Sequence, residues 1–193
     1  MEVSLRVSSR DPSTSLAMTG NLRRVKKPQA IAYWLLPELT SHEVFAQTIA
    51  GLARQFGVPR FAPHVTVFIA PENSRSPAEV LRELGAVTVD LTIRSIRFSE
   101  KFTKTLFVQF ERSDPLQEVG DRIWSASGAP ERYVIDPHLS LLYAKLSPQT
   151  KQELSDQTAF PLREVRLTSM CAIRCASPTT TPKEVEQWKL LAP

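Results

Sequence analysis

Two of the three histidines in this 193-residue chain stand in nearly identical sequence contexts. His64 lies in a Pro-His-Val-Thr-Val run, and His138 lies in a Pro-His-Leu-Ser-Leu run. Because side chains alternate along a strand, His64 shares one face with Thr66, and His138 shares one face with Ser140. The apolar neighbours point the opposite way, into the packing. Each motif therefore predicts an imidazole and a hydroxyl side by side.

The chemistry that suits two such pairs is acid–base catalysis on a phosphodiester. Across a shared cleft, one neutral imidazole can remove a proton from water while a protonated one delivers a proton to the leaving alkoxide. Histidine suits both roles because its ordinary pKa, about 6.5, lets both forms exist near neutral pH. The hydroxyls of Thr66 and Ser140 can donate hydrogen bonds to phosphate oxygens without adding charge. The near-symmetric motifs do not show which ring is the base and which the acid. We take His138 as the base and His64 as the acid, and expect both rings to border one pocket.

Other interpretations of the same residues predict different sites. A single motif is more typical of a packed, hydrogen-bonded histidine, and only the repetition favours a catalytic pair. Two histidines could also bind zinc, but catalytic zinc usually takes three protein ligands, and no His-x-x-x-His or Cys-x-x-Cys spacing occurs. His42 is interpreted as a surface residue of a helix, and Asp136, before Pro137, as a turn residue. The sequence predicts no metal and no cofactor.

The elements that must position the motifs form an internal duplication. The first half reads as strand 30–36, a helix opened by a Thr40–Glu43 capping box, strand 64–70, helix 78–84 and strand 87–93. The second half reads as strand 105–111, a helix from 114 toward 124, strand 138–144, helix 148–157 and strand 165–175, followed by a last strand over 185–192. We therefore predict an α+β fold with two pseudo-symmetric lobes of antiparallel sheet and outer helices around a central cleft.

The net charge of +4 is located in one segment of the chain. Residues 1–28 hold six basic and two acidic side chains, so residues 29–193 carry 18 of each sign. We predict a flexible basic tail over 1–28 and a single bilobal domain over 29–193. Glu2 and Asp11 are untypical of an organelle-targeting peptide. A neutral domain gives no reason to expect long-range steering onto a polyanion.

The chain lacks the roughly 18 consecutive apolar residues of a membrane span and the apolar stretch of a secretory signal. We expect a cytoplasmic monomer without membrane contact. Cys171 and Cys175 lie four residues apart in a predicted strand, roughly 13 Å at about 3.3 Å per residue. That separation exceeds the ~7 Å limit between the Cα atoms of a disulfide, so both are expected to be free thiols.

With the doubled His-x-Thr/Ser motif in view, the sequence resembles the two-histidine phosphoesterase superfamily. Residues 61–67 and 137–143 are similar to the motifs of its cyclic phosphodiesterase branch in plants and yeast, and residues 33–37 are similar to its first strand. The resemblance extends to the closing strand around Trp188. It covers nearly the whole predicted domain and leaves out the tail.

The resemblance implies a two-lobed α+β fold and a metal-independent hydrolase. Its implied substrates are ADP-ribose 1″,2″-cyclic phosphate, opened to the 1″-phosphate, and nucleoside 2′,3′-cyclic phosphates, opened to 2′-phosphates, as arise in tRNA splicing. The family's catalytic and phosphate-binding positions carry over to His64, Thr66, His138 and Ser140. Its substrate contacts carry over to Trp34, which core packing would explain equally well, and to Tyr143, which strict alternation would place on the other face of its strand.

Two further functions stay open at this point. One is the RNA-end branch of the superfamily, which opens 2′,3′-cyclic RNA termini or joins 2′–5′ ends, so RNA ends are a second partner beside a small cyclic-phosphate nucleotide. The other is a non-catalytic nucleotide-binding module, which would have no need for two imidazoles.

Overall fold

The computed structural model describes residues 27–193. The predicted basic tail therefore lies outside the described residues, except for its last two positions. Lys27 is one of these, and its ammonium lies 2.7 Å from the carboxylate of Glu184. In the described residues, no helix is both long and apolar enough to cross a membrane.

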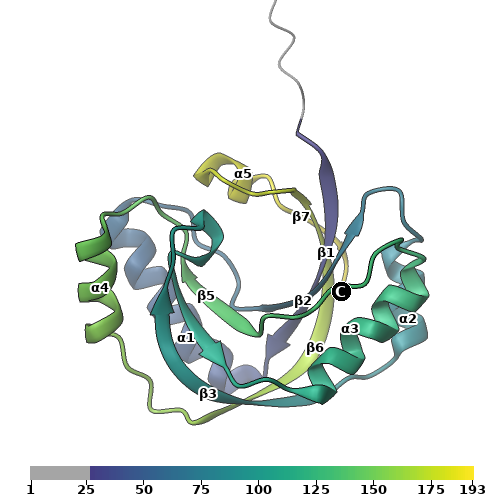
Figure 1. The fold of residues 1–193 in the computed structure, drawn as a ribbon, viewed down its shortest axis with the longest axis horizontal. Helices are drawn as coiled ribbons and strands as arrows, with labels where there is room; N and C mark the ends of the chain where they lie inside the picture. Colours follow the sequence, from purple (N-terminus) through teal and green to yellow (C-terminus); the bar gives the residue numbers. More distant parts are fainter. Residues whose placement is uncertain (1–26) are drawn as a thin grey trace, which may run out of the picture.

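The described chain alternates strands and helices in the predicted order (Figure 1). The first half consists of β1 (Gln29–Pro37), α1 (Leu39–Phe56), β2 (Val65–Pro71), α2 (Pro77–Leu84) and β3 (Val89–Phe98). The second half begins with a single 3₁₀ turn, η1 (Phe102–Lys104), and continues with β4 (Leu106–Phe110), α3 (Asp114–Ser127), β5 (His138–Leu142), α4 (Pro148–Gln157) and β6 (Glu164–Ala176). A short helix, α5 (Pro182–Glu186), and strand β7 (Lys189–Ala192) close the chain. The duplicated order and the α+β class are confirmed.

Two local predictions were wrong. Residues 185–192 do not form one strand, because Thr181 caps a helix by accepting from the Glu184 N–H at 3.3 Å, and Pro182 occupies its first turn. Helix α1 starts at Leu39 with Glu38 as its N-cap and no side-chain cap bond, so the Thr40 capping box does not form.

Some strands pair within their own half of the chain, and others pair with a strand of the other half. All neighbouring strands are antiparallel, and β1–β2 and β4–β5 pair within their own halves. The last strand of each half joins the other half instead, because β3 pairs with β4 and β6 pairs with β1. The pairings β2–β5 and β3–β6 complete a circuit, with β7 added along β6. Each lobe therefore contains strands of both halves, which fixes the lobes relative to each other.

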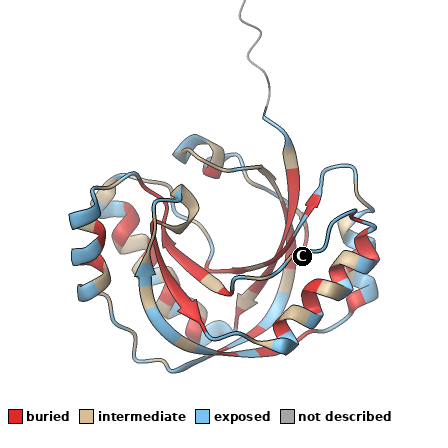
Figure 2. Ribbon diagram, viewed as in Figure 1, coloured by how far each residue is buried: buried red, intermediate tan, exposed pale blue. Residues whose placement is uncertain are grey.

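Helices cover the outer face of this curved sheet (Figure 1). Helix α1 packs against β5 and α4 against β3 and β4, while α3 packs against β2 and α2 lies beside α3. The predicted helical spacing of Phe45, Ile49 and Leu52 places all three in the core. Gly120 lets α3 approach β2 closely, because a Cβ there would meet the carbonyl oxygen of Val67 at 3.1 Å. Figure 2 shows the buried faces of the helices turned toward the sheet.

Candidate active site

The two motifs meet where β2 and β5 touch. These strands share a single residue pair, Val65 with Leu139, and both side chains are fully buried. Because side chains alternate, the histidine and the hydroxyl that flank each of these residues face the opposite side of the sheet. The antiparallel register then places the histidine of each motif beside the hydroxyl residue of the other.

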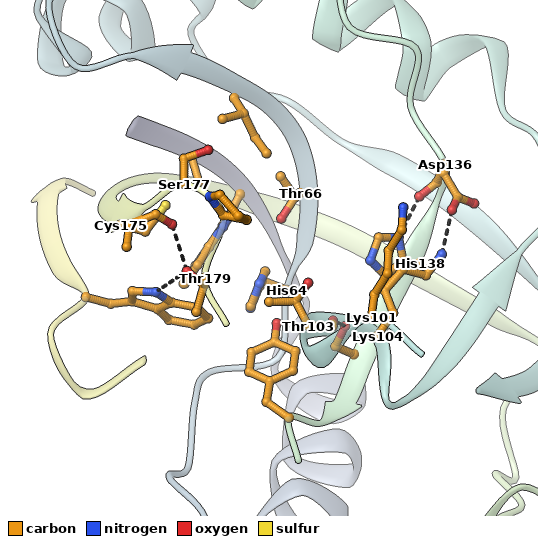
Figure 3. Close-up of a pocket in the computed structure, with 18 of the residues that line it drawn as sticks. His64, Thr66, Lys101, Thr103, Lys104, Asp136, His138, Cys175, Ser177 and Thr179 are labelled. Atoms are coloured by element: carbon orange, nitrogen blue, oxygen red, sulfur yellow. Dashed lines mark hydrogen bonds and ion pairs between the residues drawn. The ribbon is translucent and has the colours of Figure 1, made fainter. Parts of the chain in front are cut away.

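A cavity of about 330 Å³ lies on that opposite face. All six residues predicted from the sequence line it: His64, Thr66, His138, Ser140, Trp34 and Tyr143. Figure 3 shows His64 near the middle of this pocket with Thr66 above it, and His138 at one side together with Asp136, Lys101 and Lys104. The pocket therefore brings the two halves of the duplicated motif to one place.

The two imidazoles are held in the same way. His64 Nδ1 lies 2.7 Å from the carbonyl oxygen of Ala62, and His138 Nδ1 lies 2.6 Å from that of Asp136. A carbonyl oxygen only accepts hydrogen bonds, so Nδ1 carries the proton and Nε2 of a neutral ring keeps its lone pair. In each case a proline separates histidine and carbonyl, and its fixed φ angle helps to hold the turn. Both rings are thus held by a hydrogen bond to a backbone carbonyl.

The surroundings lower the pKa of both histidines to about 4. Burial is the main cause at each ring, since it penalises the charged imidazolium. The positive charge of Lys104 adds to the effect at His138, and His138 itself adds to it at His64. The expectation that an ordinary pKa leaves both forms populated at neutral pH was therefore wrong, because pKa values of about 4 make both rings neutral at that pH.

Aromatic rings surround His64. The Trp34 ring stacks on the imidazole with centroids 3.6 Å apart and planes at 12°, and Trp188 meets Trp34 edge-on at 5.2 Å. Tyr143 stacks on Phe61 at 4.0 Å. Tyr143 faces the pocket because β5 ends at the preceding residue, which releases it from strand alternation. Trp34 is only 5% exposed, so it belongs to the core and to the pocket wall at once.

Charged groups surround His138. Lys104 Nζ lies 2.5 Å from a carboxylate oxygen of Asp136 and 4.2 Å from the centroid of the Phe107 ring. Gln109 Nε2 donates to the other oxygen of Asp136 at 3.0 Å. Burial acts to raise the pKa of Asp136, but the bonds from Lys104 and Gln109 outweigh it and hold that pKa below its ordinary value. Asp136 lies in irregular backbone before β5 and is a charged partner in the site, so the prediction of a turn residue was wrong.

The sequence reasoning missed the lysines of this side. Lys101 and Lys104 both line the pocket, and both lower the pKa of His138. They come from the connection between β3 and β4, where no periodicity or motif marks them. The one available signal was that Lys101 and Lys104 stand three residues apart just before the predicted strand 105–111.

The two motif hydroxyls differ in their bonding. Ser140 Oγ donates to the carbonyl oxygen of Thr103 at 2.7 Å, so its proton is already engaged. The half-buried hydroxyl of Thr66 makes no hydrogen bond within residues 27–193 and remains available to a ligand. A phosphate in the pocket would thus meet one free hydroxyl and one that is already bonded to a loop.

Cys171 and Cys175 are free thiols, and burial raises the pKa of each to about 11. Cys175 borders the pocket. Within the described part of the chain, no three His, Cys, Asp or Glu side chains are grouped closely enough to hold a metal ion.

Solved structures and a curated protein resemble this chain. A cyclic phosphodiesterase of Arabidopsis thaliana is 26% identical over 139 residues, which cover 70% of this chain and 76% of that protein. Crystal structures of E. coli LigT complexed with ATP and with 3′-AMP align with TM-scores of 0.48 and 0.49 at 12% and 11% identity, covering 87% and 86% of this chain and 96% of each LigT chain. Usb1 of Kluyveromyces marxianus aligns over 88% of this chain and all of its own, at a TM-score of 0.41 and 11% identity.

A family model also matches the chain. The model described as the 2′-5′ RNA ligase superfamily covers residues 39–177, which is more than half of the sequence and includes both His-x-Thr/Ser motifs. This match confirms the resemblance on which the sequence analysis relied. The protein belongs to the 2′-5′ RNA ligase superfamily of two-histidine phosphoesterases.

Proposed function

We propose that the protein is a metal-independent cyclic phosphodiesterase of small nucleotides. The proposed substrates are ADP-ribose 1″,2″-cyclic phosphate and nucleoside 2′,3′-cyclic phosphates, the latter opened to 2′-phosphates. One observation carries the proposal: two imidazoles from matching motifs border one pocket, each with Nδ1 bound to backbone and Nε2 left for chemistry. The curated Arabidopsis relative, named a cyclic phosphodiesterase, supports the same reaction class.

The proposed reaction is an in-line displacement at phosphorus. His138 Nε2 takes a proton from water as the water oxygen bonds to phosphorus, and the P–O bond to one ribose oxygen breaks. The protonated His64 gives its Nε2 proton to that leaving oxygen. The cyclic diester and water become a monoester, and the two histidines exchange their protons with solvent before the next turnover.

The neighbours of each ring support this division of roles. The positive charge of Lys104 disfavours a protonated His138, which suits a base. No charged side chain other than His138 contributes to the lowered pKa of His64. A phosphate anion entering the pocket favours the imidazolium form of the ring beside it, so substrate itself supplies the condition under which His64 holds an acidic proton.

The pocket wall supports a nucleotide as the substrate. Trp34 and Tyr143 present aromatic surface next to His64, where a base or ribose can stack, and the Thr66 hydroxyl is free to donate to a phosphate oxygen. The metal-independent route is supported by Asp136, the one carboxylate that lines the pocket among the described residues, because it is already paired with Lys104.

A second candidate is hydrolysis of 2′,3′-cyclic ends of RNA. It is favoured by a second hollow of about 430 Å³ that shares Ile69 and Ser177 with the first pocket. Such an extension could hold the nucleotide that precedes a cyclic end. The neutral charge of residues 29–193 gives this candidate no electrostatic support.

The test is a substrate panel assayed in EDTA. ADP-ribose 1″,2″-cyclic phosphate, adenosine 2′,3′-cyclic phosphate and a short RNA with a 2′,3′-cyclic end are compared by kcat/KM, with H64A/H138A as the inactive variant and H42A as the matched histidine control. We expect turnover of the small substrates in EDTA, unchanged in H42A and lost in the double variant. Preference for the RNA by more than tenfold would favour the second candidate. Absence of turnover on all three would indicate a binding module.

A further inference from the structure

We propose that Lys101 binds the scissile phosphate next to His138. Residues 99–105, which we call the lysine loop, hold Lys101 in this position. This inference rests on the proposed phosphodiesterase function and adds a phosphate-binding residue outside the two motifs. Lys101 and Lys104 are the only lysines that line the pocket within the described chain, and both belong to this loop.

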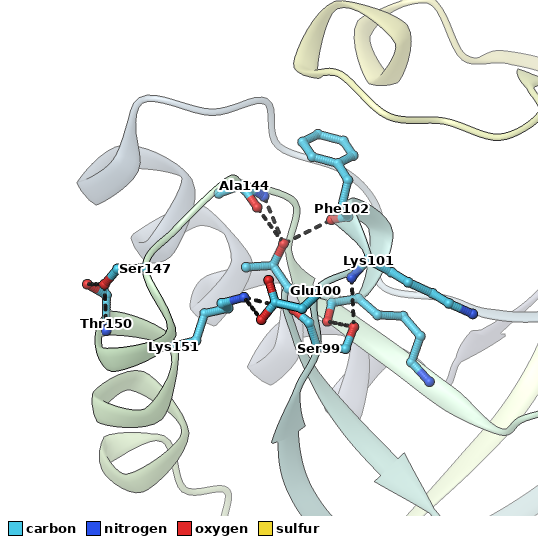
Figure 4. Close-up of polar contacts among 10 residues, drawn as sticks. Ser99, Glu100, Lys101, Phe102, Ala144, Ser147, Thr150 and Lys151 are labelled. Carbon is cyan, nitrogen blue, oxygen red and sulfur yellow. Dashed lines mark hydrogen bonds and ion pairs between the residues drawn. The ribbon is translucent and has the colours of Figure 1, made fainter.

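The end of the lysine loop is fixed by a buried threonine. The Thr105 side chain is 1% exposed, and its hydroxyl lies 2.7 Å from the carbonyl oxygen of Ala144 and 2.9 Å from that of Phe102. The Thr105 hydroxyl oxygen also accepts a hydrogen bond from the Ala144 N–H at 3.1 Å. Figure 4 shows these contacts tying the loop to the segment that follows β5.

A buried lysine fixes the outer side of the loop. The Lys151 side chain, 3% exposed, extends from α4 and places Nζ 2.5 Å from a carboxylate oxygen of Glu100 and 3.2 Å from the carbonyl oxygen of Ser99 (Figure 4). Burying an ammonium is unfavourable unless it is paired in this way. Within the loop, Ser99 Oγ also donates to the carbonyl oxygen of Lys104 at 2.8 Å.

The second motif holds the pocket side of the loop. Ser140 Oγ donates to the carbonyl oxygen of Thr103, which lies between the two lysines in sequence. The hydroxyl that the sequence pattern assigns to phosphate binding is therefore a positioning group for the lysine loop in this structure. The loop is thus anchored on three sides before any substrate enters.

The loop presents one paired and one unpaired positive charge. Lys104 is paired with Asp136, whereas the exposed side chain of Lys101 has no carboxylate within 4.0 Å among residues 27–193. With both histidines neutral, the charged groups that line the pocket leave a single positive charge. A cyclic phosphodiester carries one negative charge, so Lys101 supplies its counter-charge. Lys101 and His138 line the same pocket and lie at the same end of it (Figure 3), so the ammonium is placed to reach a phosphate beside His138.

The experiment compares K101M with K101R and with K145M, which removes an exposed lysine that does not line the pocket. Each variant is assayed on adenosine 2′,3′-cyclic phosphate with and without a 5′-phosphate, and binding of adenosine 2′-phosphate is measured by calorimetry. We expect K101M to lower kcat/KM on both substrates by the same factor, about 10-fold to 100-fold, as for a lost charge-assisted hydrogen bond. It should weaken binding of the dianionic 2′-phosphate similarly. K101R should remain within about threefold of wild type, and K145M should match wild type.

Two results would overturn the proposal. If K101M stays within twofold of K145M in both assays, Lys101 does not bind the phosphate. If the K101M defect occurs only on the 5′-phosphorylated substrate, Lys101 binds a second phosphate and not the scissile one. If wild-type protein hydrolyses neither substrate, the proposed function fails, and the calorimetric comparison still decides whether Lys101 binds the phosphate. Thermal unfolding of each variant excludes loss of fold as the cause.

Discussion

The two sides of the pocket share a motif and differ in the side chains around it. His64 stands among aromatic rings, with Trp34 stacked on it at 3.6 Å, whereas His138 stands among charges, with Lys104 and Asp136 paired beside it. The backbone bond to Nδ1 is the same on both sides. The duplicated motif therefore supplies two equivalent imidazoles, and the neighbouring side chains distinguish them.

The hydroxyls show the same divergence. Thr66 is free toward the pocket, while Ser140 is engaged by the lysine loop. We propose that the aromatic side holds the nucleoside and that the charged side holds the phosphate. The predictions below test whether this division is real.

The largest expected effect comes from removing either imidazole. H64A and H138A should each lower kcat by at least the 10²–10⁴-fold typical of general acid–base catalysis, because each ring handles a different proton. Steady-state kinetics on adenosine 2′,3′-cyclic phosphate measures this, with H42A as the control. Either variant keeping activity within tenfold of wild type would show that the two sides are not both needed.

Removing the Thr66 hydroxyl and removing the Ser140 hydroxyl should lower activity for different reasons. T66V should lower kcat/KM by about tenfold to a hundredfold through loss of a bond to the phosphate. S140A should also lower it, but by loosening the lysine loop. Hydrogen exchange of residues 99–105 should therefore speed up in S140A and stay unchanged in T66V. If hydrogen exchange of residues 99–105 is equally fast in S140A and T66V, the two hydroxyls do not have different roles.

The aromatic side should affect the nucleoside more than the phosphate. W34L should raise KM for adenosine 2′,3′-cyclic phosphate about tenfold, since stacking on a base contributes roughly 1–3 kcal/mol. Inhibition by inorganic phosphate should be unchanged in W34L and weakened in K101M. If W34L weakens inhibition by phosphate as much as it raises KM, the aromatic side does not bind the nucleoside alone.

The charged side should control one histidine pKa and not the other. K104M removes a cation and leaves Asp136 unpaired, and both changes favour the imidazolium, so the pKa of His138 should rise from about 4 toward its ordinary value. The pKa of His64, also about 4, owes nothing to Lys104 and should stay low. NMR titration of the ring protons measures both values, with K145M as the control. If the pKa values of His64 and His138 rise together in K104M, Lys104 does not act on His138 alone.

The smallest expected effect is that of the N-terminal segment. Deleting residues 1–26 keeps Lys27 and its ion pair with Glu184, and leaves every residue of the pocket in place. Turnover should remain within twofold of the full chain. A large fall in kcat would show that the basic cluster before residue 27 reaches the site.

The motif residues and their faces could be predicted because strand alternation is a local property. His64, Thr66, His138 and Ser140 need only a period of two to share a face, and the duplication indicates that the faces meet. The exchange of β3 and β6 between the halves could not be predicted in this way, because a strand carries no local signal of which partner it pairs with. The sequence also gives no sign that Ser140 bonds to Thr103.

The neighbours of the motifs were harder to predict because they depend on tertiary placement. Lys101 and Lys104 reach the pocket through a loop held by Thr105 and Lys151, which are distant from both motifs in sequence. The lowered histidine pKa values follow from burial, which the sequence does not state. Tyr143 reaches the pocket only because β5 ends one residue earlier.

We propose that His64 and His138 act on one phosphate. A crystal structure of the protein with adenosine 2′-phosphate, the proposed product, tests it most directly. We predict a phosphate group between the two rings, with Nε2 of each within about 2.6–3.2 Å of its oxygens and with the Thr66 hydroxyl and Lys101 ammonium on the same group. A phosphate that contacts only one histidine, with the other ring facing the nucleoside or solvent, would contradict the account.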